Sequence, residues 1–585
     1  MITPRSLGQT AHDAAPHRLS AALDRLPAAL AVAVGAWILI AYSVDQWRSI
    51  TVPSWDLAIF AELAKDYAHG RAPIVPIKGE GYNLLGDHFH PILILLGPVW
   101  RLFPTPLALL VVQDLLLAVS AWPLTRLATR LTTRLVATAL GLFYVLSWGI
   151  QGAAQAQFHE IAFAVPALAW ASVAFVERRW TACALWLAPL VLVKEDMGLT
   201  LVMAGGAMAL RGWQDARAGL SNDGDGGPAR WRPGRPVRVW ADLPTAVRTG
   251  AYVALFGALA FVLTVFVIVP LLSPTGAWQY GLSGNTADGM PTAPSRGTLL
   301  DRLFSPEVKV TTLFMLVCTA GGIGLASPWM SLVLPTLGWR FLADKDAYWE
   351  WKLWHYNAVL IPIALGALLD VVARRRAHGS YVADHPVRQV GVDGRAVMGR
   401  STQAALAAGE AGEAGTAGES DVDGPHRRPT AFPTWLTVPM RHRFVVATSI
   451  LTAVATGVLT APYLPLWQAT NKNFDPLAAE AKQSDEAKRT ETHRVAVAHE
   501  VIATIPEGAT VVTDLSLLAY LVPRAEVSWA GTSGPDKEYI VMTPNSANQW
   551  GTTNAATWGE QHSQQGASYS LIFNKDNYQI AKRNG

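Results

Sequence analysis

Apolar runs long enough to cross a lipid bilayer recur along most of this chain. The first, LPAALAVAVGAWILIAYSV, begins at Leu26 and follows Arg18 and Arg25, as in an uncleaved signal-anchor. A helix needs about 20 apolar residues to cross roughly 30 Å of hydrocarbon, so each such run predicts a spanning helix. Hydrophobic residues make up 51% of the chain and charged residues 16%, which is too apolar for a water-soluble multidomain protein. The sequence therefore predicts a mainly α-helical, polytopic membrane protein.

The arginines show how these runs are threaded. Short loops rich in Lys and Arg stay in the cytoplasm. Such clusters occur at the N-terminus, at 126–134, at 178–179, at 211–248 and from 374 onward. Keeping all of them inside predicts about eleven transmembrane helices in the cell membrane, with a cytoplasmic N-terminus. Their approximate positions are 27–44, 106–123, 135–151, 161–176, 180–193, 197–211, 248–272, 307–326, 328–342, 357–373 and 443–463.

The remaining segments complete a predicted domain plan. Two cytoplasmic insertions, 212–247 and 374–441, are rich in Gly, Pro, Ala and charge, which predicts disorder. The tail 464–585 contains ATVVTDLSLLAYL, EYIVM and SYSLIF, which predict a small extracytoplasmic α/β domain. The other predicted parts are a cytoplasmic tail 1–26, a transmembrane core 27–373 with an outer loop 45–105, and a last transmembrane helix within 442–463. The short run PILILLGPVWRLF predicts an interfacial helix.

Three adjacent charges, Lys194, Glu195 and Asp196, interrupt a run that is otherwise apolar from Trp180 to Leu210. One helix over that run would be about 45 Å long at about 1.5 Å per residue, too long for one crossing. Arginines flank both ends, so the segment is predicted to be a hairpin with the charges at its outer turn. Charges left in lipid cost roughly 3 kcal/mol each, so we expect the turn to be recessed in a cavity.

The same threading places four further polar clusters on the outer side. They are Asp56, Glu62 and Asp66 in SWDLAIFAELAKD; Asp87, His88 and His90 in GYNLLGDHFHP; His159 and Glu160 in AQAQFHEIAF; and Arg340, Lys345, Lys352 and His355 in RFLADKDAYWEWKLWHYN. Each cluster also allows a structural interpretation, as a helix cap, a backbone-bonded turn, a helix-terminus charge or an internal ion pair. Five separated segments with acids, imidazoles and cations exceed what membrane anchoring requires, which favours a functional site.

Cysteine usage and net charge exclude other classes. Cys183 and Cys318 fall in apolar runs and predict neither a disulfide framework nor a cysteine metal site. The net charge is +3 and the arginines lie in loops, so the sequence indicates no nucleic-acid partner.

Five motifs in order resemble those of an uncharacterised bacterial membrane family, domain of unknown function 2079, seen often in actinobacteria. They are WDLAIF, GYNLLGDHFHP, QFHEIAFAVP, LVKEDMGLT and WHYNAVLIP. The resemblance covers roughly residues 40–370 and the outer tail. The family commonly has an aspartate before the Phe-His-Glu motif, where this chain has Gln157. It resembles in turn the GT-C glycosyltransferases, multi-span enzymes that take a sugar from a polyprenyl-phosphate donor on the outer face.

That second resemblance implies an inverting sugar transfer to an extracytoplasmic glycan or protein acceptor of the cell envelope. Asp56 matches the position of the acidic residue that GT-C enzymes use as general base. Glu195 and Asp196 are also expected among the catalytic residues, where they would orient Lys194 or complete a metal shell. The residues expected at the donor phosphate are Lys194, Arg340, Lys352 and His355. A divalent cation, Mg or Mn, held by Asp87, His88, His159 and Glu160 is a further expectation.

Two other classes stay open. A transporter or channel would relay protons or cations through polar residues along the spans, and the main candidates are Gln113 and Asp114. These two have no evident successors, and no inverted repeat is visible. The third class is a non-catalytic protein that binds a lipid-linked sugar.

Overall fold

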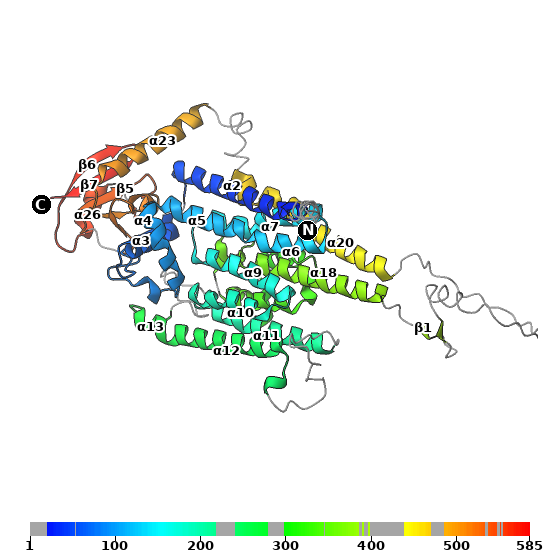
Figure 1. The fold of residues 1–585 in the computed structure, drawn as a ribbon. Helices are drawn as coiled ribbons and strands as arrows, with labels where there is room; N and C mark the ends of the chain where they lie inside the picture. The colour runs from blue at the N-terminus through cyan, green and yellow to red at the C-terminus, as the bar shows by residue number, and fades with distance from the viewer. Residues whose placement is uncertain are drawn as a thin grey trace, which may run out of the picture.

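The computed structural model describes residues 20–217, 240–278, 298–384, 389–390, 396–397, 438–469 and 485–584, apart from 21, 53, 344, 533–535, 547–549 and 552–553. These residues form a long helical bundle with a small sheet packed at one end (Figure 1). Most of the predicted cytoplasmic tail and of the two insertions predicted to be disordered lies outside the described residues.

The bundle is built from long helices joined by short helical turns. Its α-helices are α2 (Leu26–Arg48), α5 (Pro106–Val119), α6 (Ala121–Leu131), α7 (Arg134–Val145), α8 (Trp148–Gln155), α9 (Ala164–Val176), α10 (Trp180–Leu187), α11 (Met197–Arg217), α12 (Thr245–Leu263), α13 (Val269–Leu272), α15 (Glu307–Thr319), α16 (Leu334–Leu342), α18 (Leu360–Asp384) and α20 (Val438–Thr460). Shorter helices are α3 (Ser54–Ala68), α4 (Leu96–Leu102), α14 (Leu299–Phe304), α17 (Asp346–Trp349) and α21 (Pro465–Ala469). Single turns include η1 (Leu84–Gly86), η2 (Pro91–Leu95), η3 (Glu160–Phe163), η4 (Ala188–Leu192), η7 (Ile323–Ala326), η8 (Pro328–Val333) and η9 (His355–Asn357).

Six helical stretches among the described residues are long and apolar enough to cross a membrane. They are Leu26–Arg48, Pro106–Leu131, Arg134–Gln155, Thr245–Leu272, His355–Ala377 and Arg443–Tyr463. Shorter apolar helices occupy Pro91–Leu102, where an interfacial helix is predicted, and Glu160–Val176 and Trp180–Leu192. Helices lie at all eleven predicted positions. Several are too short for a straight crossing, so multiple apolar spans are established while the number eleven stays a prediction.

The arginine-rich loops gather at one end of the bundle. Arg134 pairs with Asp24 at 2.8 Å, and Arg376 donates to the carbonyl of Leu131 at 2.8 Å. Segments far apart in sequence therefore meet here, next to the described N-terminal residues (Figure 1). We call this the arginine end and the opposite end, which carries the C-terminal sheet, the sheet end.

Helices α11 and α12 approach each other closely. A Cβ atom on Gly205 would lie 2.2 Å from the carbonyl oxygen of Gly250, and one on Gly257 would lie 2.4 Å from that of Gly198. Small residues allow helix backbones to pack at such distances in a membrane. Because α11 begins directly after Asp196, this seam fixes the position of the charged triplet.

The tail forms the predicted α/β domain. Its strands are β3 (Thr510–Thr513), β4 (Glu526–Trp529), β5 (Tyr539–Met542), β6 (Tyr569–Lys575) and β7 (Tyr578–Arg583), in the order β4-β3-β5-β7-β6. Strands β4, β3 and β5 are parallel, whereas β7 pairs antiparallel with β5 and β6. The helices are α23 (Asp485–Thr504), α24 (Leu518–Leu521) and α26 (Ala555–His562), and a separate antiparallel pair consists of β1 (Gln389–Val390) and β2 (Ala396–Val397).

The α/β domain docks on α3. Lys65 donates to the carbonyls of Val522 at 2.9 Å and Ala525 at 2.7 Å. The carboxylate of Glu62 accepts from the backbone N–H of Val527 at 3.3 Å. Apolar side chains of α3 and of the domain also share one buried core. The domain therefore holds the helix that carries Asp56.

We expect this docking to weaken as pH rises through about 7. Burial, against the attraction of Lys65, raises the pKa of Glu62 from 4.5 to about 7. Between pH 4.5 and about 7, Glu62 therefore keeps a proton in the docked state that it loses in the undocked state. The contribution of this proton to the free energy of docking is complete below pH 4.5 and disappears as pH passes about 7. Hydrogen–deuterium exchange of the α24 amides, corrected for intrinsic rates, should show falling protection over this range.

The substitution Glu62→Gln should remove the pH dependence of that protection. A matched control is Asp66→Asn on the same helix. Asp66 pairs with Arg71 in its own loop at 2.8 Å, and no hydrogen bond or ion pair joins it to the described residues of the domain. Protection in Glu62→Gln that still follows pH as in the wild type would refute this account.

Candidate functional site

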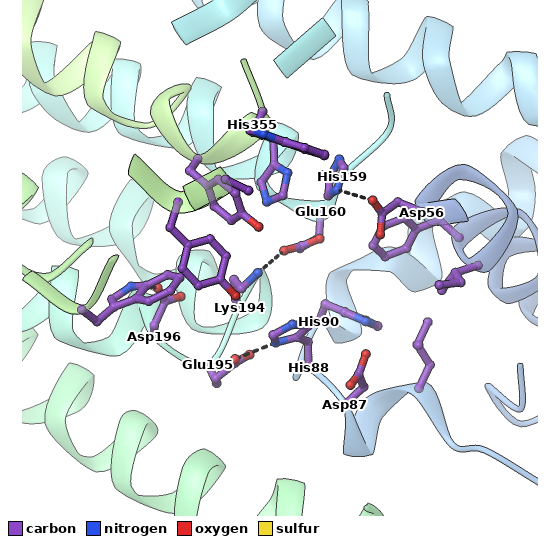
Figure 2. Close-up of a pocket in the computed structure, with 18 of the residues that line it drawn as sticks. Asp56, Asp87, His88, His90, His159, Glu160, Lys194, Glu195, Asp196 and His355 are labelled. Atoms are coloured by element: carbon purple, nitrogen blue, oxygen red, sulfur yellow. Dashed lines mark hydrogen bonds and ion pairs between the residues drawn. The ribbon is translucent and has the colours of Figure 1, made fainter. Parts of the chain in front are cut away.

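A cavity of about 350 Å³ lies at the sheet end of the bundle (Figure 2). It brings together α3, the turn before η2, the turn before η3, the turn before α11 and the 339–356 segment. The predicted site residues that line it are Asp56, Asp87, His88, His159, Glu160, Lys194, Glu195, Asp196 and His355. Five separated segments thus meet in one hollow, which agrees with the geometric expectation from the threading.

Asp56 is the carboxylate of this set most open to the cavity. It lies in the first turn of α3, after Ser54. Its side chain is 39% exposed, and its Oδ2 lies 3.4 Å from Nε2 of His159. Figure 2 shows the two side chains directed at each other. A carboxylate with a free edge beside an imidazole can accept a proton from a bound hydroxyl group.

The charged triplet is tied to its neighbours by buried ion pairs. Lys194 donates to Glu160 at 2.8 Å, and Nδ1 of His88 lies 2.7 Å from Glu195 (Figure 2). Burial opposes the charge on Lys194, but Glu160 with Glu195 and Asp196 raises its pKa well above the usual range. Burial likewise opposes the charge on Glu195, yet His88 and Lys194 lower its pKa to about 2. Lys194, Glu160 and Glu195 therefore stay charged inside the protein.

Asp196 differs from its neighbour. It accepts from the indole N–H of Trp339 at 3.0 Å. Burial is the largest influence and raises the pKa of Asp196 to about 6. Two adjacent carboxyl groups therefore titrate far apart, so Asp196 can carry a proton under mildly acidic conditions while Glu195 cannot.

His159 lies between Asp56 and His355. Its ring stacks on that of His355 with centroids 3.6 Å apart. Burial disfavours the charged form of His159, but Asp56 together with Glu160 raises its pKa above the ordinary value. The imidazole is thus poised to hold a positive charge next to the exposed carboxylate.

Aromatic rings form much of the cavity wall. They are Trp55, Phe60, Phe261, Trp278, Trp339, Tyr348, Trp354 and Tyr356. Flat rings with a polar edge suit the apolar face of a sugar and can also approach cations. The aromatic run that the sequence places near residue 350 therefore contributes to the site.

The residues expected to hold a divalent cation do not fit one. Asp87 is paired with Lys78 at 3.3 Å and also accepts from Tyr82 at 3.0 Å. The other three are engaged by Glu195, Asp56 and Lys194. Within the described part of the chain, no group of three or more His, Cys, Asp or Glu side chains is arranged to hold a metal ion. We therefore assign no step to a metal.

Two cations expected at a donor phosphate lie elsewhere. Arg340 is 0% exposed and does not line the cavity; it donates to the carbonyl of Tyr348 at 2.9 Å and to Asn357 at 2.9 Å. Arg340 therefore stabilises the 340–357 segment from outside the cavity. Lys352 is also absent from the lining.

Lys78 and Lys345 line the cavity instead. Lys78 lies shortly before the GYNLLGDHFHP motif in the sequence. This closeness to a predicted site motif was the signal from which Lys78 could have been found.

Comparisons with known proteins give a family model and a distant structural likeness. The model is described as a predicted membrane protein (DUF2079) and matches residues 48–388. Among solved structures, the chain is similar to the apo form of the Archaeoglobus fulgidus oligosaccharyltransferase, with 11% identity and a TM-score of 0.37. That likeness covers 91% of this chain and 71% of the other, and a score this low does not establish a shared function. No curated protein matches.

Proposed function

This chain belongs to the family of predicted membrane proteins called DUF2079, and from its cavity we propose that it is a glycosyltransferase-like membrane enzyme. The observation that supports this most is a contrast between carboxylates. Asp56 is 39% exposed beside an imidazole, whereas Glu160 and Glu195 are almost fully buried in ion pairs. One accessible base within a fixed, charged and aromatic surrounding suits the activation of a hydroxyl nucleophile.

In the proposed reaction, Asp56 accepts the proton of an acceptor hydroxyl. The acceptor oxygen forms a bond to the anomeric carbon from the face opposite the donor phosphate. The bond between that carbon and the phosphate oxygen breaks, and the polyprenyl phosphate leaves with the electron pair. The configuration at the anomeric carbon is inverted, and the charge on His159 stabilises Asp56 before the transfer.

The leaving phosphate requires positive charge on its side of the cavity. Lys194 supplies it in this proposal, and Lys345 lies on the same lining. Glu160, Glu195 and Asp196 keep Lys194 charged and oriented instead of reacting themselves. Of the two roles that the sequence offered for Glu195 and Asp196, the proposal keeps the orientation of Lys194 and not the completion of a metal shell.

An apolar groove suits the isoprenoid part of the donor. It has a volume of about 710 Å³ and is bordered by Val202 on α11, Leu316 on α15 and Leu337 on α16. Helices α11 and α16 also contribute Leu199 and Trp339 to the polar cavity. A lipid tail in the groove would therefore place its phosphate near the cavity without crossing the bundle.

The proposed orientation places the arginine end in the cytoplasm. The sheet end, with the cavity and the α/β domain, would then face outward from the cell membrane. There it would meet an extracytoplasmic glycan or protein acceptor.

The test is transfer of radiolabelled sugar from polyprenyl-phosphate donors by the purified full chain in liposomes. We expect label to move to an added glycan or protein acceptor, and a polyprenyl-phosphate lipid to copurify. Proton or cation flux through the same liposomes, without transfer, would overturn the proposal in favour of a transporter. Donor binding without transfer to any acceptor would favour a non-catalytic binder.

A further inference from the structure

The turn that presents His159 contains a strained residue. Gln157 has a φ of +72°, in the left-handed region that side chains other than glycine disfavour. It follows α8, which ends at Gln155. A residue persists in this conformation only where its surroundings hold it there, and such residues cluster at functional sites.

A buried amide from the second predicted span holds this turn. Nε2 of Gln113 on α5 donates to the carbonyl of Gln157 at 2.9 Å and to that of Ala153 at 3.2 Å. Its Oε1 accepts from the backbone N–H of His159 at 3.0 Å. Gln113 is 1% exposed, so no water competes for these bonds.

A third glutamine completes the arrangement. Nε2 of Gln157 donates to Oε1 of Gln46 on α2 at 2.8 Å, and Gln46 donates to the hydroxyl of Tyr42 at 2.8 Å. We call Gln46, Gln113 and Gln157 the glutamine clamp. It fastens one turn to two helices that lie far from it in sequence.

The clamp decides which edge of the imidazole faces the cavity. Nδ1 of His159 lies 3.1 Å from the carbonyl of Gln157, and a carbonyl can only accept, so Nδ1 carries a proton. The opposite nitrogen, Nε2, then points to Asp56. We propose that the glutamine clamp is a positioning device that orients His159 toward Asp56 for sugar transfer.

The role of the clamp in sugar transfer rests on the proposed function. Its role in orienting His159 rests only on the hydrogen bonds. Other charged or titratable groups also face His159. They are Asp56 on α3, Glu160 beside it and His355 on η9, with Lys194 bonded to Glu160. None of these replaces the bonds from Gln113 to the backbone of the turn.

The test compares two buried glutamines of the same bundle. Gln113→Met removes the amide that holds the turn. The matched control is Gln151→Met in α8. Gln151 is also buried and bonded twice, but its bonds go to Leu146 at 2.6 Å and Leu466 at 3.1 Å and not to the turn before His159. Exchange of the imidazole C2 proton, followed residue by residue by mass spectrometry, reports the surroundings of His159 without requiring activity.

We expect Gln113→Met to change the C2 exchange rate of His159 and to lower kcat about tenfold at similar KM, because a misplaced catalytic group slows the chemical step. Gln151→Met should alter neither. Gln46→Met, which leaves the bonds from Gln113 intact, should give a smaller change in the same direction and serves if Gln113→Met does not fold. The clamp proposal would be overturned if the C2 exchange rate of His159 were unchanged in both clamp variants. It would also be overturned if that rate changed equally in Gln151→Met. If the wild type transfers no sugar, the proposed function fails, while the exchange comparison still decides whether the clamp positions His159.

Discussion

Replacing Asp56 with asparagine is expected to lower sugar transfer by about 10² to 10⁴-fold. The amide keeps the shape of the side chain but cannot take a proton from the acceptor hydroxyl. Asp56 is partly exposed, and His159, which Asp56 helps to keep protonated, can release its proton when that carboxylate is neutralised. No unpaired charge is then left in a buried core, and the protein should fold normally. Initial rates of label transfer, with donor binding measured in parallel, separate loss of chemistry from loss of binding.

Asp66→Asn is the matched control for this experiment. Asp66 lies on the same helix as Asp56 but pairs with Arg71 and does not line the cavity. We expect it to retain transfer. Asp56→Asn with wild-type rates would remove Asp56 as the base and, with it, the main support for the proposed reaction.

Replacing Lys194 with methionine is expected to destabilise the protein strongly. The partner carboxylate of Glu160 is only 3% exposed, so it would be left charged and unpaired inside the protein. Breaking a buried pair in this way costs about 3–5 kcal/mol. Thermal unfolding in detergent, with the yield of folded protein from size-exclusion chromatography, measures the loss.

The double variant Lys194→Met/Glu160→Gln should recover most of this stability, because neither partner is then charged. It should not recover transfer, since the positive charge proposed for the leaving phosphate is still missing. The contrasting pair is Arg179 with Glu177 at the arginine end, where the arginine side chain is 55% exposed. Arg179→Met should cost about 1 kcal/mol or less. Full activity in the double variant would exclude Lys194 from phosphate stabilisation.

Part of the site could be predicted from the sequence because its signals are local. Charges inside an apolar run are visible without any structure, as with Lys194, Glu195 and Asp196. The positive-inside rule then placed these charges on the same side as Asp56 and His159. Apolar spans and the tail strands were visible for the same reason, since periodicity and composition act over a few turns of chain.

The partners of each charge could not be predicted in this way. His88 and Glu195 are 107 positions apart, and Lys194 and Glu160 are 34 apart, so their pairing depends on how the bundle closes. Arg340 and Lys194 look alike in sequence as cations that follow an apolar run. In the structure Arg340 stabilises a loop from outside the cavity, whereas Lys194 lines the cavity.

Gln113 illustrates the same division. In sequence it is an isolated polar residue in a span, and a relay through the membrane was one interpretation of it. In the structure the nitrogen and the oxygen of its side-chain amide are both hydrogen-bonded to the backbone of the turn that ends at His159. The sequence by itself determined which segments avoid water and which carry charge, because transfer free energy belongs to each residue. The tertiary structure alone decided which charges are neutralised and which stay available, because that depends on distances between atoms brought together only by folding.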